Sequence, residues 1–207
     1  MKNKILNDDQ REYYRDSINE LYSLCPDTIK RKIPNANAQQ AFVLKTVKDL
    51  YIDGEILSVG SFDDTASESL IKLGYDVKEI DPSINYDLHE YYQLNNMKKF
   101  NIIISTSVIE HVKDDELFID EICKLLNDGG YAILTCDYKN DYKQGDHKPS
   151  VDYRLYTKYD LLERLRNILL LNNCDIYGDY NYDDIDNFQY EYCTYSFATY
   201  VIKKNNI

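Results

Sequence analysis

One stretch, residues 55–81, constrains the fold of this 207-residue chain more than any other. It is predicted to form a buried strand, a tight glycine turn, a helix and a second buried strand that ends in an acid: Ile56–Val59, Gly60, residues 65–73, Val77–Ile80 and Asp81. A strand–helix–strand unit of this kind crosses over with a right hand and leaves its two strands parallel. Ligands bind beyond the carboxyl ends of such strands, so a site is expected beside Gly60 and Asp81.

The rest of the chain continues the alternation of helices and strands. Helices are expected at residues 8–24, 37–50, 115–126 and 158–171, and strands at 101–105, 131–136 and 194–202. The acidic segment 179–189 would join the last strand to a partner and add an antiparallel edge. We therefore predict one α/β domain over residues 1–207, with a helical cap (1–50) and a core (51–207). Its sheet would be mostly parallel, with an antiparallel C-terminal strand and helices on both faces.

Three helix ends carry local signals. Thr65 followed by Glu68 is a capping-box pattern, and Thr157 is a plausible N-cap residue. The first helix should stop before Cys25 because Pro26 disfavours helical geometry in the residue that precedes it.

Composition narrows the classes of function. The formal net charge is -12, which is a poor electrostatic match to nucleic acid, because affinity for a polyanion comes from neutralised phosphates. The five cysteines form no CxxC pair, so we expect reduced thiols and no structural zinc site. With no apolar run of about 20 residues and no signal peptide, a cytoplasmic protein without a membrane partner is expected.

Two segments together resemble a known family. They are residues 55–81 and residues 100–136, the latter containing Glu110-His111-Val112 after a buried strand. This combination is similar to the class I S-adenosylmethionine-dependent methyltransferases, and it implies their Rossmann-like sheet and their cofactor. The family's first turn usually reads acid-x-Gly-x-Gly-x-Gly, whereas this chain has Ser58, Gly60, Phe62 and Asp64 at those positions. Only 18 residues separate Asp81 from Phe100, where the family has a helix, a strand and a further helix, so at least one element must be missing.

The cofactor contacts follow partly from chemistry and partly from the resemblance. A carboxylate can dock at the N-terminus of the helix after Gly60, and Asp81 can accept both ribose hydroxyls. With Ser58 in place of the usual acid, the methionine ammonium would meet Ser58, backbone carbonyls or another carboxylate such as Asp63. The expected cofactor-binding residues are Ser58, Gly60, Asp81, Asp87, Leu88, Ser105 and Thr106, of which Asp87 and Leu88 would lie near the adenine.

Histidines are the candidate bases. His111 follows the strand that would line the cofactor cleft, and His147 lies in the loop after the next strand. The resemblance places substrate contacts at Arg154 and Tyr156, whereas Glu110 and His89 are interpreted as structural and surface residues. No metal ligands are expected, although Asp146 with His147 keeps a metal-assisted variant open.

The leading hypothesis is methylation of a hydroxyl on a small molecule or carbohydrate, with a sugar or glycan precursor favoured. A small-molecule N-methyltransferase and a catalytically silent binding module of the same fold are the alternatives. A nicotinamide-dependent oxidoreductase is disfavoured because the turn lacks its second glycine. The sequence leaves the oligomeric state undetermined.

Overall fold

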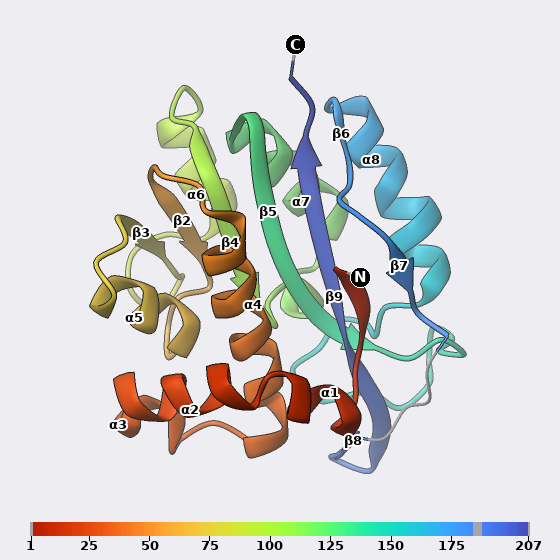
Figure 1. Ribbon diagram of the computed structural model, residues 1–207. Helices are drawn as coiled ribbons and strands as arrows, with labels where there is room; N and C mark the ends of the chain where they lie inside the picture. The colour runs from red at the N-terminus through yellow and green to blue at the C-terminus, as the bar shows by residue number, and fades with distance from the viewer. Residues whose placement is uncertain (1, 184–187, 207) are drawn as a thin grey trace.

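A single twisted sheet runs through the computed structural model, which describes residues 2–183 and 188–206 (Figure 1). Within those residues the strand order is β3-β2-β4-β5-β9-β1-β7, and β6 and β8 also pair with β9. The strands are β1 (Asn3–Leu6), β2 (Ile56–Val59), β3 (Val77–Ile80), β4 (Phe100–Thr106), β5 (Leu126–Tyr138), β6 (Cys174–Ile176), β7 (Tyr180–Asn181), β8 (Phe188–Tyr190) and β9 (Cys193–Lys204).

Strands β2, β3, β4 and β5 form the parallel part of the sheet. β2 pairs in parallel with both β3 and β4, and β4 pairs in parallel with β5. β9 then runs antiparallel to β5, from Tyr131 opposite Lys203 to Tyr138 opposite Ser196. The predicted α/β class, with a mostly parallel core and an antiparallel C-terminal strand, is confirmed.

Helices cover both faces of this sheet (Figure 1). β4 shows the division: Ile103 belongs to the apolar cluster of Phe118 on α7, whereas Ile102 and Ile104 belong to that of Phe42 on α4. Alternate strand residues therefore supply two separate cores, as a sheet buried on both faces requires. The helices are α1 (Asp8–Tyr13), α2 (Arg15–Leu24), α3 (Pro26–Ile29), α4 (Asn37–Leu50), α5 (Thr65–Lys72), α6 (Leu88–Asn95), α7 (Asp115–Leu125) and α8 (Leu165–Leu171), with short 3₁₀ turns η1 (Pro34–Ala36) and η2 (Ile109–His111) and a π-helical turn η3 (Asp160–Arg164).

The N-terminal cap differs from the prediction in two ways. The helix expected at 8–24 is broken at Tyr14, whose buried ring packs edge-on against Phe42 with 6.0 Å between ring centroids. Residues Asn3–Leu6, for which no structure was predicted, form β1 and pair antiparallel with β9. β9 is consequently an inner strand and not the edge that was expected. Part of the acidic segment 179–189 lies outside the described residues.

Some of the predicted helix and strand ends are confirmed and others are wrong. α2 ends at Leu24, before Pro26, and Thr157 Oγ1 accepts a hydrogen bond from the Asp160 N–H at 3.2 Å, so both of these signals are confirmed. The Thr65 capping box is wrong, because Asp64 is the N-cap of α5 and accepts from the Ala66 and Ser67 N–H groups. β5 begins at Leu126, earlier than expected, across a register shift opposite Phe100 that absorbs the glycine pair.

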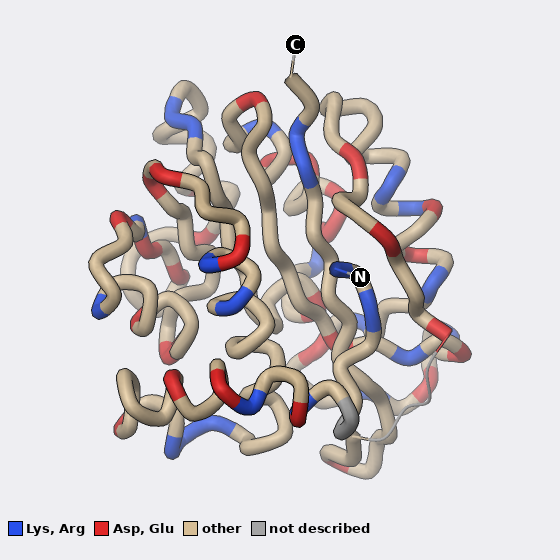
Figure 2. The backbone as a smooth tube through the Cα atoms, in the orientation of Figure 1, with Lys and Arg blue, Asp and Glu red and all other residues tan. Residues whose placement is uncertain are grey.

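The compressed segment after Asp81 holds one helix, α6, and no strand among the described residues. The predicted loss of at least one family element is therefore confirmed. Acidic and basic residues are scattered along the whole chain trace (Figure 2).

In the turn between β2 and α5, the backbone lies against Val108, which follows β4. Gly60 has φ +76°, and its N–H donates to the Ile80 carbonyl at 2.9 Å. A Cβ atom at this position would overlap the Val108 side chain. A glycine is therefore needed here both for the left-handed backbone and for the close approach.

Replacing Gly60 by alanine should lower the free energy of unfolding by about 2–4 kcal/mol, since left-handed strain and overlap add. Gly74→Ala is the matched control, because Gly74 has φ +89° and nothing within 4 Å of its added Cβ. Urea denaturation of both variants measures the difference. Equal losses would show that Val108 yields and that only the backbone conformation matters.

Candidate active site

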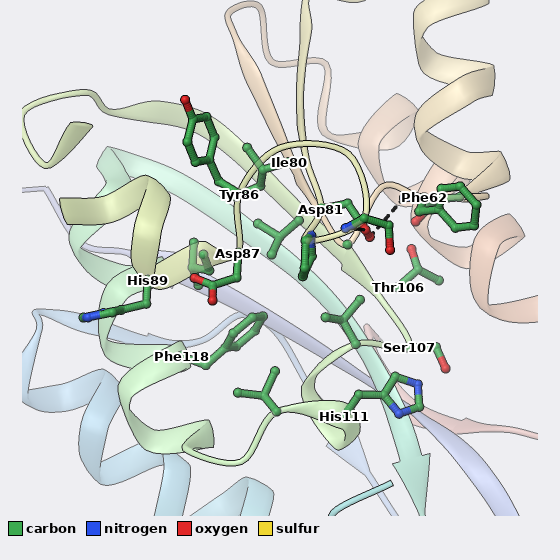
Figure 3. Close-up of a pocket in the computed structure, with 18 of the residues that line it drawn as sticks. Phe62, Ile80, Asp81, Tyr86, Asp87, His89, Thr106, Ser107, His111 and Phe118 are labelled. Atoms are coloured by element: carbon green, nitrogen blue, oxygen red, sulfur yellow. Dashed lines mark hydrogen bonds between the residues drawn. The ribbon is translucent and has the colours of Figure 1, made fainter. Parts of the chain in front are cut away.

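A cavity of about 880 Å³ opens at the carboxyl ends of β2, β3 and β4 (Figure 3). Its walls come from four parts of the chain: the turn after β2, the segment after β3, the end of β4 with η2 and α7, and cap residues 31–40. The cap therefore closes over the edge of the sheet where the sequence placed a ligand site.

Asp81 joins two of these walls. It ends β3 and is 9% exposed, and its Oδ1 accepts from the Ser83 N–H at 2.7 Å. Its Oδ2 accepts from the Phe62 N–H at 3.2 Å, the bond drawn in Figure 3. An ionised carboxylate has about four acceptor positions, so each oxygen can still accept a ligand hydroxyl.

Asp64 changes the expected chemistry of the first turn. Its Oδ1 accepts from the Ala66 and Ser67 N–H groups at 2.7 and 3.1 Å, so the helix N-terminus is already capped by a carboxylate. The expectation that a ligand carboxylate docks on these N–H groups is therefore wrong. Asp64 Oδ2 is buried at the cavity wall and makes no hydrogen bond within the described residues.

Burial also raises the pKa of the Asp64 carboxyl, so a cation beside it would stabilise its charged form. The alternatives named from sequence lie elsewhere. Ser58 is fully buried inside β2 and off the cavity, because it sits between the paired strands β3 and β4. Asp63 does not line the cavity, and its carboxylate is already paired with the cavity-lining Arg31 at 2.5 Å.

The segment after β3 supplies further expected residues. Asp87 is the N-cap of α6, in a capping box with Glu90, and both Asp87 and Leu88 line the cavity. Ile80, Tyr86 and Phe118 add apolar surface to the same walls. An adenine contact of Asp87 and Leu88 stays a prediction.

Of the two residues predicted at the end of β4, only Thr106 lines the cavity. Its hydroxyl has no hydrogen-bond partner within the described residues. Ser105 is 1% exposed and lies off the cavity, because neighbouring residues of a strand face opposite sides. The assignment of Ser105 to the cofactor is thus corrected.

His111 lines the cavity at η2, with its Nδ1 3.0 Å from Asp152 Oδ1. Asp152 is 4% exposed, and the neighbouring Glu110 is fully buried and accepts from the Ser107 hydroxyl at 2.6 Å. The hydrogen bond with Asp152 raises the pKa of the His111 imidazole, against the lowering by burial. Burial raises the pKa of Glu110 to about 7.

Three predicted residues lie away from the cavity walls. His147 is exposed on the loop after β5. Tyr156 is fully buried, and its hydroxyl donates to Asp115 at 2.9 Å, while Arg154 pairs with the same carboxylate at 2.9 Å. Arg154 and Tyr156 hold the start of α7 in place, so the structure contradicts their assignment to the substrate.

Several groups at the cavity or behind it were not predicted as site residues. Asp64 could have been, because it occupies a position where the family has glycine. Gln39 and Gln40, buried at the start of α4, line the cavity and leave their Oε1 atoms without a partner in the described residues. Asp152 lies 41 residues from His111 in sequence, and no local pattern links them.

Comparisons with known proteins agree with this geometry. A family model described as a methyltransferase domain matches residues 9–177. The chain therefore belongs to the methyltransferase-domain family, and its fold is that of the class I S-adenosylmethionine-dependent methyltransferases. No helix among the described residues has the length and apolar character needed to cross a membrane.

A ubiquinone biosynthesis O-methyltransferase from Pelagibacter ubique is 30% identical over 97 residues, which are 39% of this chain and 40% of that relative. The match thus spans less than half of that protein. A Burkholderia thailandensis 1,6-didemethyltoxoflavin-N1-methyltransferase has a similar fold, with a TM-score of 0.57 and 11% identity over 94% of this chain and 88% of that one. For the magnesium protoporphyrin IX methyltransferase of Synechocystis the TM-score is 0.52, with 14% identity over 94% and 98%.

The raised pKa of Glu110 predicts a pH-dependent stability. Because the folded pKa lies near 7, above the ordinary 4.5, stability is fully present below pH 4.5 and is lost as the pH rises through 7. Glu110→Gln keeps an acceptor for Ser107 and should be about 2–3 kcal/mol more stable than the wild type at pH 8, but nearly equal at pH 5. Urea denaturation across this range measures it, with the exposed Glu163→Gln as control. Parallel curves for wild type and Glu110→Gln would contradict the prediction.

Proposed function

We propose that this methyltransferase transfers the methyl group of S-adenosylmethionine to a hydroxyl of a small molecule. The observation that carries the proposal is the cavity at the carboxyl ends of β2, β3 and β4, with Asp81 at one wall and Asp64 Oδ2 at another. The two carboxylates match the two polar ends of this cofactor, whose ribose offers hydroxyl donors and whose methionine part offers an ammonium.

The residues present suit the cofactor. Asp81 would accept the ribose hydroxyls, while the apolar surface of Ile80, Leu88 and Phe118 would cover the adenine. Asp64 Oδ2 and the Thr106 hydroxyl are buried polar atoms without partners in the described residues, and the methionine ammonium would satisfy the carboxylate. When bound, the cofactor supplies a methyl group on a positively charged sulfur. The protein's part is alignment, which can contribute roughly 7–11 kcal/mol.

The acceptor would lie between the cap and η2. Gln39 and Gln40 present unpartnered carboxamide oxygens, which accept hydrogen bonds from hydroxyl groups. His111, which lines the same cavity from η2, would take the hydroxyl proton as a general base. A sugar hydroxyl and a phenolic hydroxyl both fit this donor and acceptor pattern. The Pelagibacter relative is an O-methyltransferase of ubiquinone biosynthesis, which supports a hydroxyl acceptor.

Cofactor binding tests the proposal. Calorimetry should detect S-adenosylhomocysteine and not NAD, and Asp81→Ala should weaken binding roughly 10–150-fold, since a hydrogen bond to a charged group contributes about 1.5–3 kcal/mol. Asp76→Ala, at the amino end of β3 and away from the cavity, is the control and should bind normally. No binding of S-adenosylhomocysteine to folded wild-type protein would favour a silent binding module.

The role of Asp64 has its own prediction. Asp64→Asn keeps an N-cap residue for α5 but removes the charge. It should weaken S-adenosylhomocysteine roughly 10–150-fold while leaving 5′-deoxy-5′-methylthioadenosine, which lacks the amino-acid part, unchanged. Calorimetry with both ligands measures this, and Asp63→Asn serves as the neighbouring control. Equal losses for both ligands would show that Asp64 supports the turn and does not bind the ammonium.

A further inference from the structure

Three buried carboxyl groups gather behind His111. Glu110 on η2, Asp137 on β5 and Asp152 in the loop after β5 are 0%, 5% and 4% exposed. Within the described residues no lysine or arginine side chain forms an ion pair with any of the three carboxyls, whereas Asp152 pairs with the His111 imidazole. The Lys148 ammonium binds the backbone carbonyl of Asp152 and not its carboxyl. Among the described residues, the imidazole is therefore the cation that pairs with a carboxylate of this group.

The three carboxyls act on one another electrostatically. The Ser107 hydroxyl donates to Glu110 at 2.6 Å. Burial, then the charges of Glu110 and Asp152, hold the pKa of Asp137 well above its usual range. The surroundings of Asp137 therefore favour its neutral form.

Such an arrangement is costly if its purpose is only structural. A buried carboxyl without a cationic partner disfavours its own ionised state, and unpaired buried charge destabilises a fold. Clusters of perturbed acids beside a cavity are typical of sites that handle protons. The position of His111 between this cluster and the cavity connects it to the ligand site.

We infer that Asp152 is a positioning residue that orients the His111 ring and stabilises its positive charge, with Glu110 and Asp137 setting the charge of the cluster. This role rests on the proposed function. The acceptor O–H bond breaks and its proton goes to the His111 imidazole, while the oxygen's electron pair forms the bond to the methyl carbon. The carbon–sulfur bond breaks with its electron pair on sulfur, which leaves as a neutral thioether. The positive charge lost by sulfur thereby ends on His111, beside Asp152.

The groups that face the imidazole determine its titration. They are Asp152 from the loop, Glu110 from the same η2 turn and the Val151 carbonyl, and all three favour the protonated ring. Partial exposure of the ring, 41% of its side chain, lets the proton leave to solvent after each turnover.

Nuclear magnetic resonance of the histidine rings tests the inference on the full chain. The three histidines give three Cε1–H signals, and His111→Gln identifies that of His111. In the wild type His111 should titrate above ordinary imidazole with its Nδ1 protonated, and Asp152→Asn should lower its titration midpoint and abolish the preference for this tautomer. Asp141→Asn, an exposed acid of the same loop, is the control and should leave both unchanged.

Calorimetry with S-adenosylhomocysteine on the same variants distinguishes failure of the inference about Asp152 from failure of the proposed function. Asp152→Asn should bind within about twofold of wild type, since Asp152 does not line the cavity. An unchanged His111 titration with intact binding overturns the inference alone, whereas absence of binding to wild type overturns the proposed function and this role with it. If Asp152→Asn does not fold, the wild-type titration decides, and a midpoint at or below that of free imidazole overturns the inference.

Discussion

The site depends on one carboxylate that ties two loops together. Asp81 stands at the end of β3 and accepts from the N–H of Phe62 in the turn after β2. The parallel pairing of β2 with β3 brings these ends side by side, and the Gly60 N–H adds a bond to the Ile80 carbonyl. The wall of the cavity is thus held by the same register that builds the core, so cofactor geometry and sheet geometry are coupled.

Around this wall, acids serve two different purposes. Asp64 and Asp81 border the part of the cavity assigned to the cofactor, and each accepts hydrogen bonds from backbone N–H groups. Glu110, Asp137 and Asp152 lie off the cavity walls, behind His111. The first two acids are therefore placed to contact a ligand directly, whereas the other three would act on it through His111.

The parts of the fold that the sequence predicts well are those with strong local signals. β2, β3 and α4 match to the residue. β2 is buried throughout, as expected, but β3 ends the strand order of the described residues and is fully buried only at Ile80, so the prediction of a second buried strand is wrong. β1 escapes prediction because its four residues include Asn3 and Lys4, and only pairing with β7 and β9 makes them a strand. In the site, Asp81 and His111 follow from the strands before them. Tyr156 and Asp152 do not, because their neighbours lie some 40 residues away in sequence and are known only once the chain is folded.

The pairing of β1 with β9 bears on how a ligand gains entry. The cap begins in the sheet, where Asn3 accepts from the Val201 N–H at 2.6 Å, and it ends in α4, whose residues are buried against the core. A segment held at both ends cannot move aside as one rigid body without breaking strand hydrogen bonds or displacing a core helix. Between those anchors, residues 30–36 connect α3 to α4 and include the cavity-lining Arg31 and Lys32. We expect substitutions in this connecting stretch to change access to the cavity with less effect on the fold than substitutions at either anchor.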